Sequence, residues 1–209
     1  MAAAAAFVRA SKPDDELFLM NFADKAGLEV PFTSDRSLLE SGIARVDAVG
    51  GTALRDAIAK AEAYLSSGAS RERKALLLVS DGNDNARGTS RDVIVQQAEH
   101  GDIAIYALGL QAEGDSARAR RGRDALDDLS ERTGGSAHFP SGADDIEPVA
   151  AAIARQIRSE YTLGYTPVDQ ALDGSYRKLR VVVKGGEHLS VRTRAGYRAT
   201  ADAGSKTQK

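Results

Sequence analysis

This 209-residue sequence contains no cysteine. Disulfide bonds and thiolate metal sites are therefore excluded. Long apolar runs are also absent, so no segment reaches the roughly 20 apolar residues that a membrane-spanning helix needs. Residues 1–6 are rich in alanine but have neither a basic start nor a leucine-rich core, so they do not resemble a signal peptide.

Signatures of catalysis are missing as well. The sequence has no Gly-x-Ser-x-Gly turn, no Walker-type phosphate loop and no Gly-x-Gly-x-x-Gly run. The three histidines, His100, His138 and His188, are far apart in the sequence, and nothing pairs them as metal ligands or as a catalytic base. We therefore expect a protein that is not an enzyme.

The charge of the chain is nearly balanced. A net charge of −2 argues against a general nucleic-acid-binding protein. One basic run stands out, formed by Arg118, Arg120, Arg121 and Arg123, and it is expected in a loop over residues 111–122 and at the start of the helix that follows. It is either a patch for a nucleic acid or an acidic partner, or a solvated loop, and the lack of interleaved aromatic residues favours the solvated loop.

What the sequence does contain is a regular alternation of apolar and amphipathic segments over residues 1–159. Buried strands are predicted over Glu16–Phe22, Leu28–Phe32, Arg73–Ser80, Asp102–Leu110 and Ser136–Phe139. Helices are predicted over Ala2–Ala10, Asp35–Val46, Ala53–Ser66, Ser90–His100, Arg123–Arg132 and Asp145–Ser159. This alternation predicts an α/β fold with a doubly wound, mainly parallel sheet.

The pattern changes after Ser159. Apolar and polar residues alternate over 161–165, 179–183 and 189–193, which is typical of antiparallel strands with one face in water. We therefore divide the chain into an α/β domain over residues 1–159, an antiparallel β extension over 160–200 and a disordered tail over 201–209.

Two polar features are expected at one edge of the sheet. Gly50-Gly51-Thr52 places a hydroxyl at the first turn of a helix, and Asp81-Gly82 places a carboxylate just beyond a buried strand. Ligands of open α/β sheets bind at the carboxyl ends of the strands. A hydroxyl and a carboxylate there suit Mg²⁺, which prefers oxygen ligands. Without a ligand, Thr52 is simply a helix N-cap and Asp81-Gly82 an ordinary turn.

At these residues the chain resembles a known family. GGTAL and LLLVSDGND resemble the second and third elements of the metal-ion-dependent adhesion site of von Willebrand factor type A (VWA) domains. SKPDDELFLMNFAD, DIAIYALGL and LSERTGGSAHF resemble other parts of that fold. SEYTLGYTP and YRKLRVVVKGGEHLSVRTRAGYRA are similar to the tail of an acidobacterial subgroup, the VWFA-related proteins. The resemblance covers nearly the whole chain.

The resemblance implies a protein-binding module of the adhesion or complex-assembly type. In such a module a bound Mg²⁺ with an open coordination position accepts a carboxylate from the protein partner. Thr52 would ligate the metal directly and Asp81 would act through water. Gly50, Gly51 and Gly82 would support the loops, because glycine lets the backbone approach closely.

The first element of that site, Asp-x-Ser-x-Ser, is absent. Asp-x-Ser occurs only at Asp35, Asp128 and Asp173, and none of these has the second serine or follows an apolar strand. The motif is expected just before the Ala2–Ala10 helix, so we interpret its loss as a truncation that removes the first, central strand. The sheet then closes over a gap or leaves two inner edges facing solvent or a partner.

Only Thr52 and Asp81 would then remain of five oxygen-bearing side chains, so we expect weak Mg²⁺ binding at best. Two other functions stay open: a metal-independent scaffolding module, and a hydrolase that uses Asp81 with a metal. The compartment is also open. Relatives of this kind are commonly exported, and any signal would lie upstream of Met1.

Overall fold

The computed structural model describes residues 1–23, 25–46, 54–71, 73–80, 91–110, 117–185 and 191–200. The chain begins with helix α1 (Ala2–Ala10), followed by an antiparallel hairpin of strands β1 (Leu17–Phe22) and β2 (Ala26–Thr33) and by helix α2 (Arg36–Arg45). Asp35 caps α2, because its Oδ1 accepts a hydrogen bond of 2.9 Å from the backbone N–H of Ser37.

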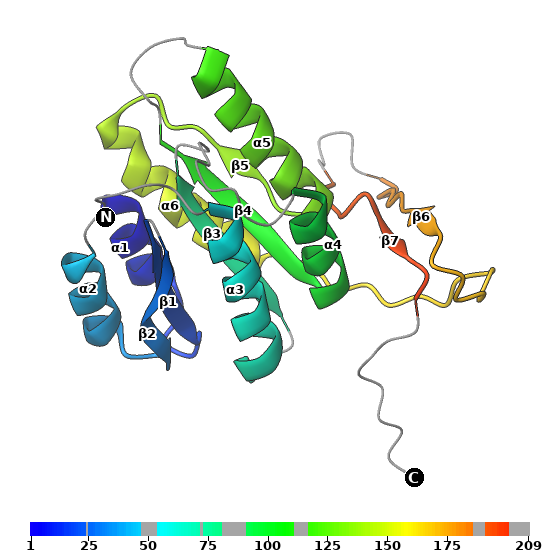
Figure 1. Ribbon diagram of the computed structural model, residues 1–209, viewed down its shortest axis with the longest axis horizontal. Coiled ribbons are helices and arrows are strands. Elements are labelled where there is room, and N and C mark those ends of the chain that lie inside the picture. The colour runs from blue at the N-terminus through cyan, green and yellow to red at the C-terminus, as the bar shows by residue number, and fades with distance from the viewer. Residues whose placement is uncertain are drawn as a thin grey trace.

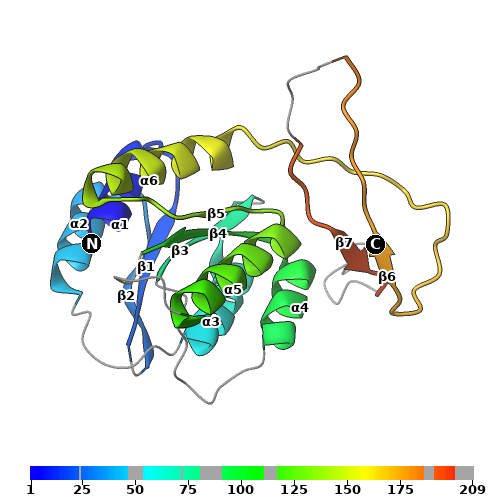
Figure 2. The same ribbon diagram turned by 90° about the horizontal axis from the view of Figure 1, so that it is seen from above.

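The second part is a three-stranded parallel sheet in the order β3-β4-β5. Its strands are β3 (Lys74–Ser80), β4 (Ile103–Gly109) and β5 (Ala137–His138), and its helices are α3 (Leu54–Gly68), α4 (Arg91–Gly101), α5 (Ala117–Thr133) and α6 (Ala143–Arg158). Figures 1 and 2 show α3, α4 and α5 on one face of the sheet, with α1 and α6 on the other. The predicted α/β class with a parallel sheet covered on both faces is confirmed.

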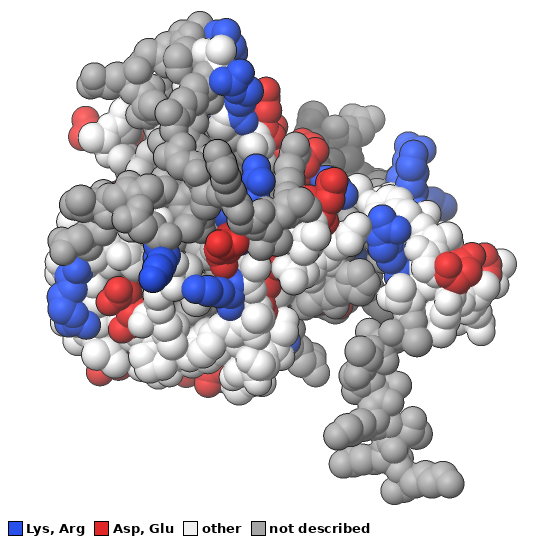
Figure 3. All heavy atoms as spheres, viewed as in Figure 1, with Lys and Arg blue, Asp and Glu red and all other residues white. Residues whose placement is uncertain are grey.

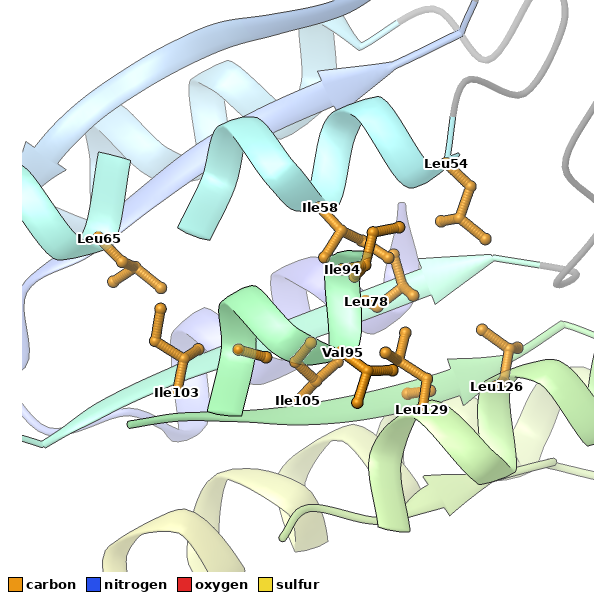
Figure 4. Close-up of a cluster of buried hydrophobic side chains, with 12 residues drawn as sticks. Leu54, Ile58, Leu65, Leu78, Ile94, Val95, Ile103, Ile105, Leu126 and Leu129 are labelled. Carbon is orange, nitrogen blue, oxygen red and sulfur yellow. The ribbon is translucent and has the colours of Figure 1, made fainter. Parts of the chain in front are cut away.

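Strand β4 carries the core of both layers. Ile103 and Ile105 belong to the apolar cluster under α3, α4 and α5, which Figure 4 shows in close-up. Tyr106 and Leu108 belong to the cluster under α1 and α6. Because side chains alternate along a strand, a continuous apolar run fills both layers, as expected for a strand buried on both faces.

The described residues form no continuous sheet across the hairpin and the parallel strands. Strands β1 and β3 are not hydrogen-bonded neighbours, and β1-β2 and β3-β4-β5 are separate sheets. Of the two predicted arrangements, the described residues have the one with two inner edges, whereas the truncation itself stays a prediction.

The C-terminal part contains two antiparallel strands, β6 (Tyr176–Lys178) and β7 (Gly196–Arg198). These strands are three residues long and lie outside the alternating runs from which strands were predicted; residues 161–165 and 179–183 are not in strands. Residues 193–194 lie against the turn after α5, where a β-carbon on Gly134 (φ +89°) would lie 3.0 Å from the backbone N of Arg194. Residues 201–209 lie outside the described part.

Several element boundaries differ from the prediction, and two of the differences matter for the argument. Helix α5 begins at Ala117, so the arginine run lies on a helix rather than in a loop. Strand β2 continues through Pro31 to Thr33, although proline was expected to end it. β2 pairs only with β1, and Pro31 falls outside the paired positions, so the missing backbone N–H disrupts no described pairing.

Candidate functional site

The candidate site lies at the carboxyl edge of the parallel sheet. β3 and β4 end in register, with Ser80 opposite Gly109, and the N–H of Leu110 donates to the carbonyl oxygen of Ser80 at 2.9 Å. Helix α3 begins at Leu54, whose buried side chain shares a cluster with Leu78 of β3. Figure 4 shows Leu54 on the same side as the arrowhead of β3. The start of α3 and the end of β3 therefore lie at one edge.

The predicted site residues Gly50, Gly51, Thr52, Asp81 and Gly82 all lie outside the described residues. The structure does describe Leu54, two residues after Thr52, and Ser80, directly before Asp81. These are the first residue of α3 and the last residue of β3, both at the carboxyl edge. The ligand roles of Thr52 and Asp81 stay predictions.

An aromatic ring lies against the end of β4 at this edge. A β-carbon on Gly109 would lie 2.3 Å from Cδ1 of Phe139, so only glycine leaves room for the ring. The guanidinium carbon of Arg123 lies 5.5 Å from the ring centroid, a cation–π distance. Sequence reasoning missed this group, because the three residues are distant in the chain and form no local pattern.

The same edge is bordered by cationic side chains. Arg120, Arg121 and Arg123 are exposed on the first half of α5. Figure 3 shows basic side chains gathered on the end of α5 at the top of the view. Helix α5 follows β4, and Thr133 at its far end accepts a hydrogen bond of 3.0 Å from the N–H of Ile105 near the start of β4. The arginine-bearing end of α5 therefore lies beside the carboxyl ends of the strands.

His138 has a partner that the sequence did not reveal. Ser136 Oγ and His138 Nε2 are 3.0 Å apart, and the Ser136 hydroxyl also donates to Gln156 Oε1 at 3.4 Å. Burial and then the charge of Arg192 lower the pKa of His138, against a smaller opposing effect of Gln156. Ser136 is only 7% exposed, so this pair forms an internal hydrogen-bond network rather than an accessible nucleophile.

The described part of the chain offers no grouped donors for a metal. Within the described ranges, no three His, Cys, Asp or Glu side chains are grouped so that they hold a metal ion. The predicted donors, Thr52 and Asp81, add one hydroxyl and one carboxylate. Mg²⁺ requires a near-octahedral set of oxygens and is usually held by one or two carboxylates together with other ligands. That Mg²⁺ binds weakly at best therefore stays a prediction.

Comparison with known proteins identifies the fold. The sequence model of the von Willebrand factor type A domain matches residues 1–83. No curated protein matches the sequence. Within the described part of the chain, no helix is long and apolar enough to cross a membrane.

Solved structures resemble the chain over about three quarters of its length. BatB from Bacteroides thetaiotaomicron is 18% identical, with 76% of this chain and 86% of that chain covered and a TM-score of 0.60. A von Willebrand factor type A protein from Catenulispora acidiphila is 17% identical, with 73% and 37% covered and a TM-score of 0.59.

The pilus adhesin SpaC from Lactobacillus rhamnosus GG is 14% identical, with 75% of this chain and 27% of that chain covered and a TM-score of 0.59. The chain therefore spans well under half of two of these three structures. At such identities the likeness establishes the fold alone. Together with the match over residues 1–83, it shows that this chain has the fold of a VWA domain.

Proposed function

We propose that the chain is a protein-binding module that engages its partner at the carboxyl edge of the parallel sheet, where β3 ends at Ser80 and α3 begins at Leu54. The observation that carries this proposal is the placement of both ends at one edge in a VWA fold. Ligands of open α/β sheets bind at this edge. One protein of the same fold, SpaC, is a pilus adhesin, which supports a role in adhesion or complex assembly.

The charge of the edge supports a partner that presents a carboxylate. The exposed Arg120, Arg121 and Arg123 lie on the half of α5 that borders it. A guanidinium group forms two parallel hydrogen bonds with a carboxylate, so an acidic side chain of the partner has donors here without a metal. These arginines lie near the N-terminus of α5. The positive end of the helix dipole is there and also attracts an anionic group of the partner.

Mg²⁺ has at most a secondary part in the proposal. Thr52 would ligate the ion and Asp81 would act through water, with Gly50, Gly51 and Gly82 shaping the loops. Because the donor set is too small for tight binding, no step depends on the metal. A metal-independent scaffolding module is the alternative, and export of the chain stays a prediction.

The test is affinity capture from extracts of the source organism by the immobilised 209-residue chain. It uses the unchanged chain, the Arg120→Glu/Arg121→Glu double variant and the Asp81→Ala variant, each with Mg²⁺ and with chelator. We expect a specific partner that the double arginine variant loses at least tenfold. The Lys60→Glu variant, which changes an exposed cation on α3, is the control.

Four outcomes separate the alternatives. Capture that chelator and Asp81→Ala both abolish indicates metal-dependent adhesion, and capture that neither affects, but the arginine change abolishes, indicates a metal-independent contact at the same edge. Capture that none of the changes affects contradicts the proposed edge. Hydrolysis of generic ester or phosphate substrates that falls with Asp81→Asn would favour the hydrolase instead.

A further inference from the structure

Exposed apolar side chains are concentrated after α6. Of the fourteen large apolar side chains that are exposed in the described part of the chain, nine belong to residues 161–191. Tyr161 is 91% exposed, Leu163 69% and Val182 66%. Single exposed apolar residues are normal in proteins, but a concentration of them marks a surface that contacts a partner. We refer to residues 160–185 and 191–200 as the C-terminal part.

The α/β domain does not cover these side chains. Figures 1 and 2 both show the C-terminal part at one side of the domain. Within its described ranges, only Gly196 and Ala199 are fully buried. An ion pair of 2.5 Å joins Arg194 to Asp102, directly before β4. The C-terminal part therefore contacts the domain at the amino-terminal end of β4, opposite the edge that carries the candidate site.

The C-terminal part is also positively charged. Residues 160–200 contain seven Lys or Arg residues and four Asp or Glu residues, although the net charge of the whole chain is −2. Figure 3 shows basic side chains beside uncharged surface in this part, at the right of the view. A surface of this sign attracts anionic partners. Five of its basic residues are exposed in the described structure: Lys178, Arg180, Lys184, Arg192 and Arg198.

Cationic and apolar residues lie next to each other in this part. Arg180 and Lys184 flank three consecutive valines, of which Val182 and Val183 are exposed. On the segment that returns to the domain, the exposed Val191 precedes the exposed Arg192. A partner of this surface must therefore offer negative charge and an apolar environment side by side.

The surface of an anionic lipid bilayer offers both. Its negative charge attracts Lys and Arg side chains, and tyrosine is enriched at the level of the headgroups. Attachment strengthens with the apolar area that is buried and with the attraction to anionic lipids. A protein partner needs a surface that is complementary in shape to each projecting side chain, whereas fluid lipid fits around it.

Charge also favours one orientation on such a surface. Because residues 160–200 are net positive in a chain of net charge −2, the remaining residues are net negative, and an anionic bilayer repels them. Since the C-terminal part lies at one side of the molecule, it can face the bilayer while the α/β domain stays in water.

We propose that the C-terminal part attaches the protein to the surface of an anionic lipid bilayer. Its exposed tyrosine, leucine and valine side chains lie at the headgroup level, and its exposed Lys and Arg side chains contact lipid phosphates. The attachment is peripheral and needs no membrane-spanning helix. This surface is separate from the carboxyl edge of the sheet and does not depend on the proposed function.

The experiment measures sedimentation of the 209-residue chain with lipid vesicles, in chelator so that no divalent ion bridges protein and lipid. Vesicles of phosphatidylcholine alone are compared with vesicles of equal parts phosphatidylcholine and phosphatidylglycerol. Leu163→Ser/Leu172→Ser removes two exposed apolar side chains of the C-terminal part. Leu28→Ser/Leu38→Ser makes the same change at exposed positions of the α/β domain and is the matched control.

A second pair of variants tests the charge. Arg180→Gln/Lys184→Gln removes two exposed cations of the C-terminal part, and Arg155→Gln/Lys60→Gln removes two exposed cations of the α/β domain. We expect binding to the anionic vesicles only, weaker at high salt because salt screens the attraction. Each double variant of the C-terminal part should weaken binding by roughly tenfold or more, and neither control should change it.

A fluorescent label locates the contact without removing charge. Because the chain has no cysteine, Leu163→Cys provides a single attachment point for a fluorophore that reports the polarity of its surroundings. Its emission should shift to the blue when anionic vesicles are added, whereas the same label at Leu38→Cys on α2 should not respond. Thermal unfolding of every variant confirms that it is folded, and if a double variant is not, the two labels decide.

Four results would overturn the proposal. The first is no binding to anionic vesicles. The second is binding that Leu163→Ser/Leu172→Ser leaves unchanged and that heparin, a soluble polyanion, reproduces, because charge alone would then explain it. The third is loss of binding in Arg120→Glu/Arg121→Glu on α5 but not in Arg180→Gln/Lys184→Gln. The fourth is a concentration-dependent dimer in which the label at residue 163 is already in an apolar environment without vesicles, because a second copy of this chain would then cover the surface.

Discussion

The ring of Phe139 occupies the space that any side chain at residue 109 would need. A β-carbon on Gly109 would lie 2.3 Å from Cδ1 and 2.4 Å from Cε1 of that ring. Gly109 is the last residue of β4, and Phe139 directly follows β5. This contact fixes the carboxyl ends of two parallel strands against each other, and with them one side of the candidate site.

Gly109→Ala should therefore destabilise the protein by about 1–3 kcal/mol, the usual effect of overpacking a tight contact. Urea unfolding measures the change. Gly142→Ala is the matched control, since a β-carbon there meets nothing within 4 Å, and it should stay within about 0.5 kcal/mol of the unchanged chain. In a Phe139→Ala background, where the ring is absent, the Gly109→Ala change should destabilise the protein less. Equal stability of the two glycine variants would contradict the proposed steric role of Phe139.

The buried side chain of Glu62 should make the stability of the protein depend on pH. It is 3% exposed, and neither carboxylate oxygen has a hydrogen-bond partner within the described structure. Burial raises the pKa of Glu62 from 4.5 to about 8. Between these values the unfolded chain releases the proton while the folded chain keeps it. The contribution of Glu62 to the free energy of unfolding is therefore complete below about pH 4.5 and is lost as the pH rises to about 8.

Glu62→Gln should remove this loss, because the amide does not ionise. At about 1.4 kcal/mol per pKa unit, the unchanged chain should lose up to several kcal/mol of unfolding free energy between pH 5 and 8.5 relative to the variant. Urea unfolding at several pH values measures the difference. Glu40→Gln, at an exposed position on α2, should follow the unchanged chain. Parallel pH profiles for the unchanged chain and Glu62→Gln would rule out a buried neutral carboxyl.

Arg158 ties the ends of two helices together. Its guanidinium donates to the carbonyl oxygen of Ala10 at 2.6 Å, so the last turn of α6 holds the last residue of α1. Arg158→Met keeps most of the aliphatic stem but leaves this carbonyl without its charged donor, so we expect a loss of about 1–2 kcal/mol in thermal unfolding. Arg155→Met changes an exposed arginine one turn earlier and should have little effect. A comparable loss in both variants would mean that helix charge, not the contact with Ala10, is responsible.

The sequence predicted the structure best for strands that are buried on both faces. Strands β3 and β4 were predicted to within one residue at each end, because a run that is apolar at every position suits only a strand with helices on both faces. The start of α5 was missed for the opposite reason. Before Leu126 that helix has arginine, alanine, glycine and one aspartate but no large apolar residue, so no helical periodicity marks it. Its high helix propensity was the signal that could have located it.

The candidate site was predictable only in part. Thr52 and Asp81 were proposed from local motifs, and the structure describes their neighbours Leu54 and Ser80 at the expected edge. The Arg123–Phe139 contact could not have been predicted, because it depends on how α5 crosses β4 and β5. In the C-terminal part, alternation predicted antiparallel pairing but not its register, since both faces are largely exposed and neither fixes which residues face inward.

The small donor set at the candidate site predicts how the chain responds to Mg²⁺. With Thr52 and Asp81 as the only expected ligands, titration calorimetry should detect no micromolar binding of Mg²⁺ to the 209-residue chain. If the dissociation constant exceeds the 1 mM Mg²⁺ used, binding stabilises the folded state by less than about 0.4 kcal/mol. The thermal unfolding temperature should then be the same with 1 mM Mg²⁺ and with chelator, and Asp81→Ala should not change that result. Micromolar binding that Asp81→Ala abolishes would show instead that further oxygen ligands complete the site.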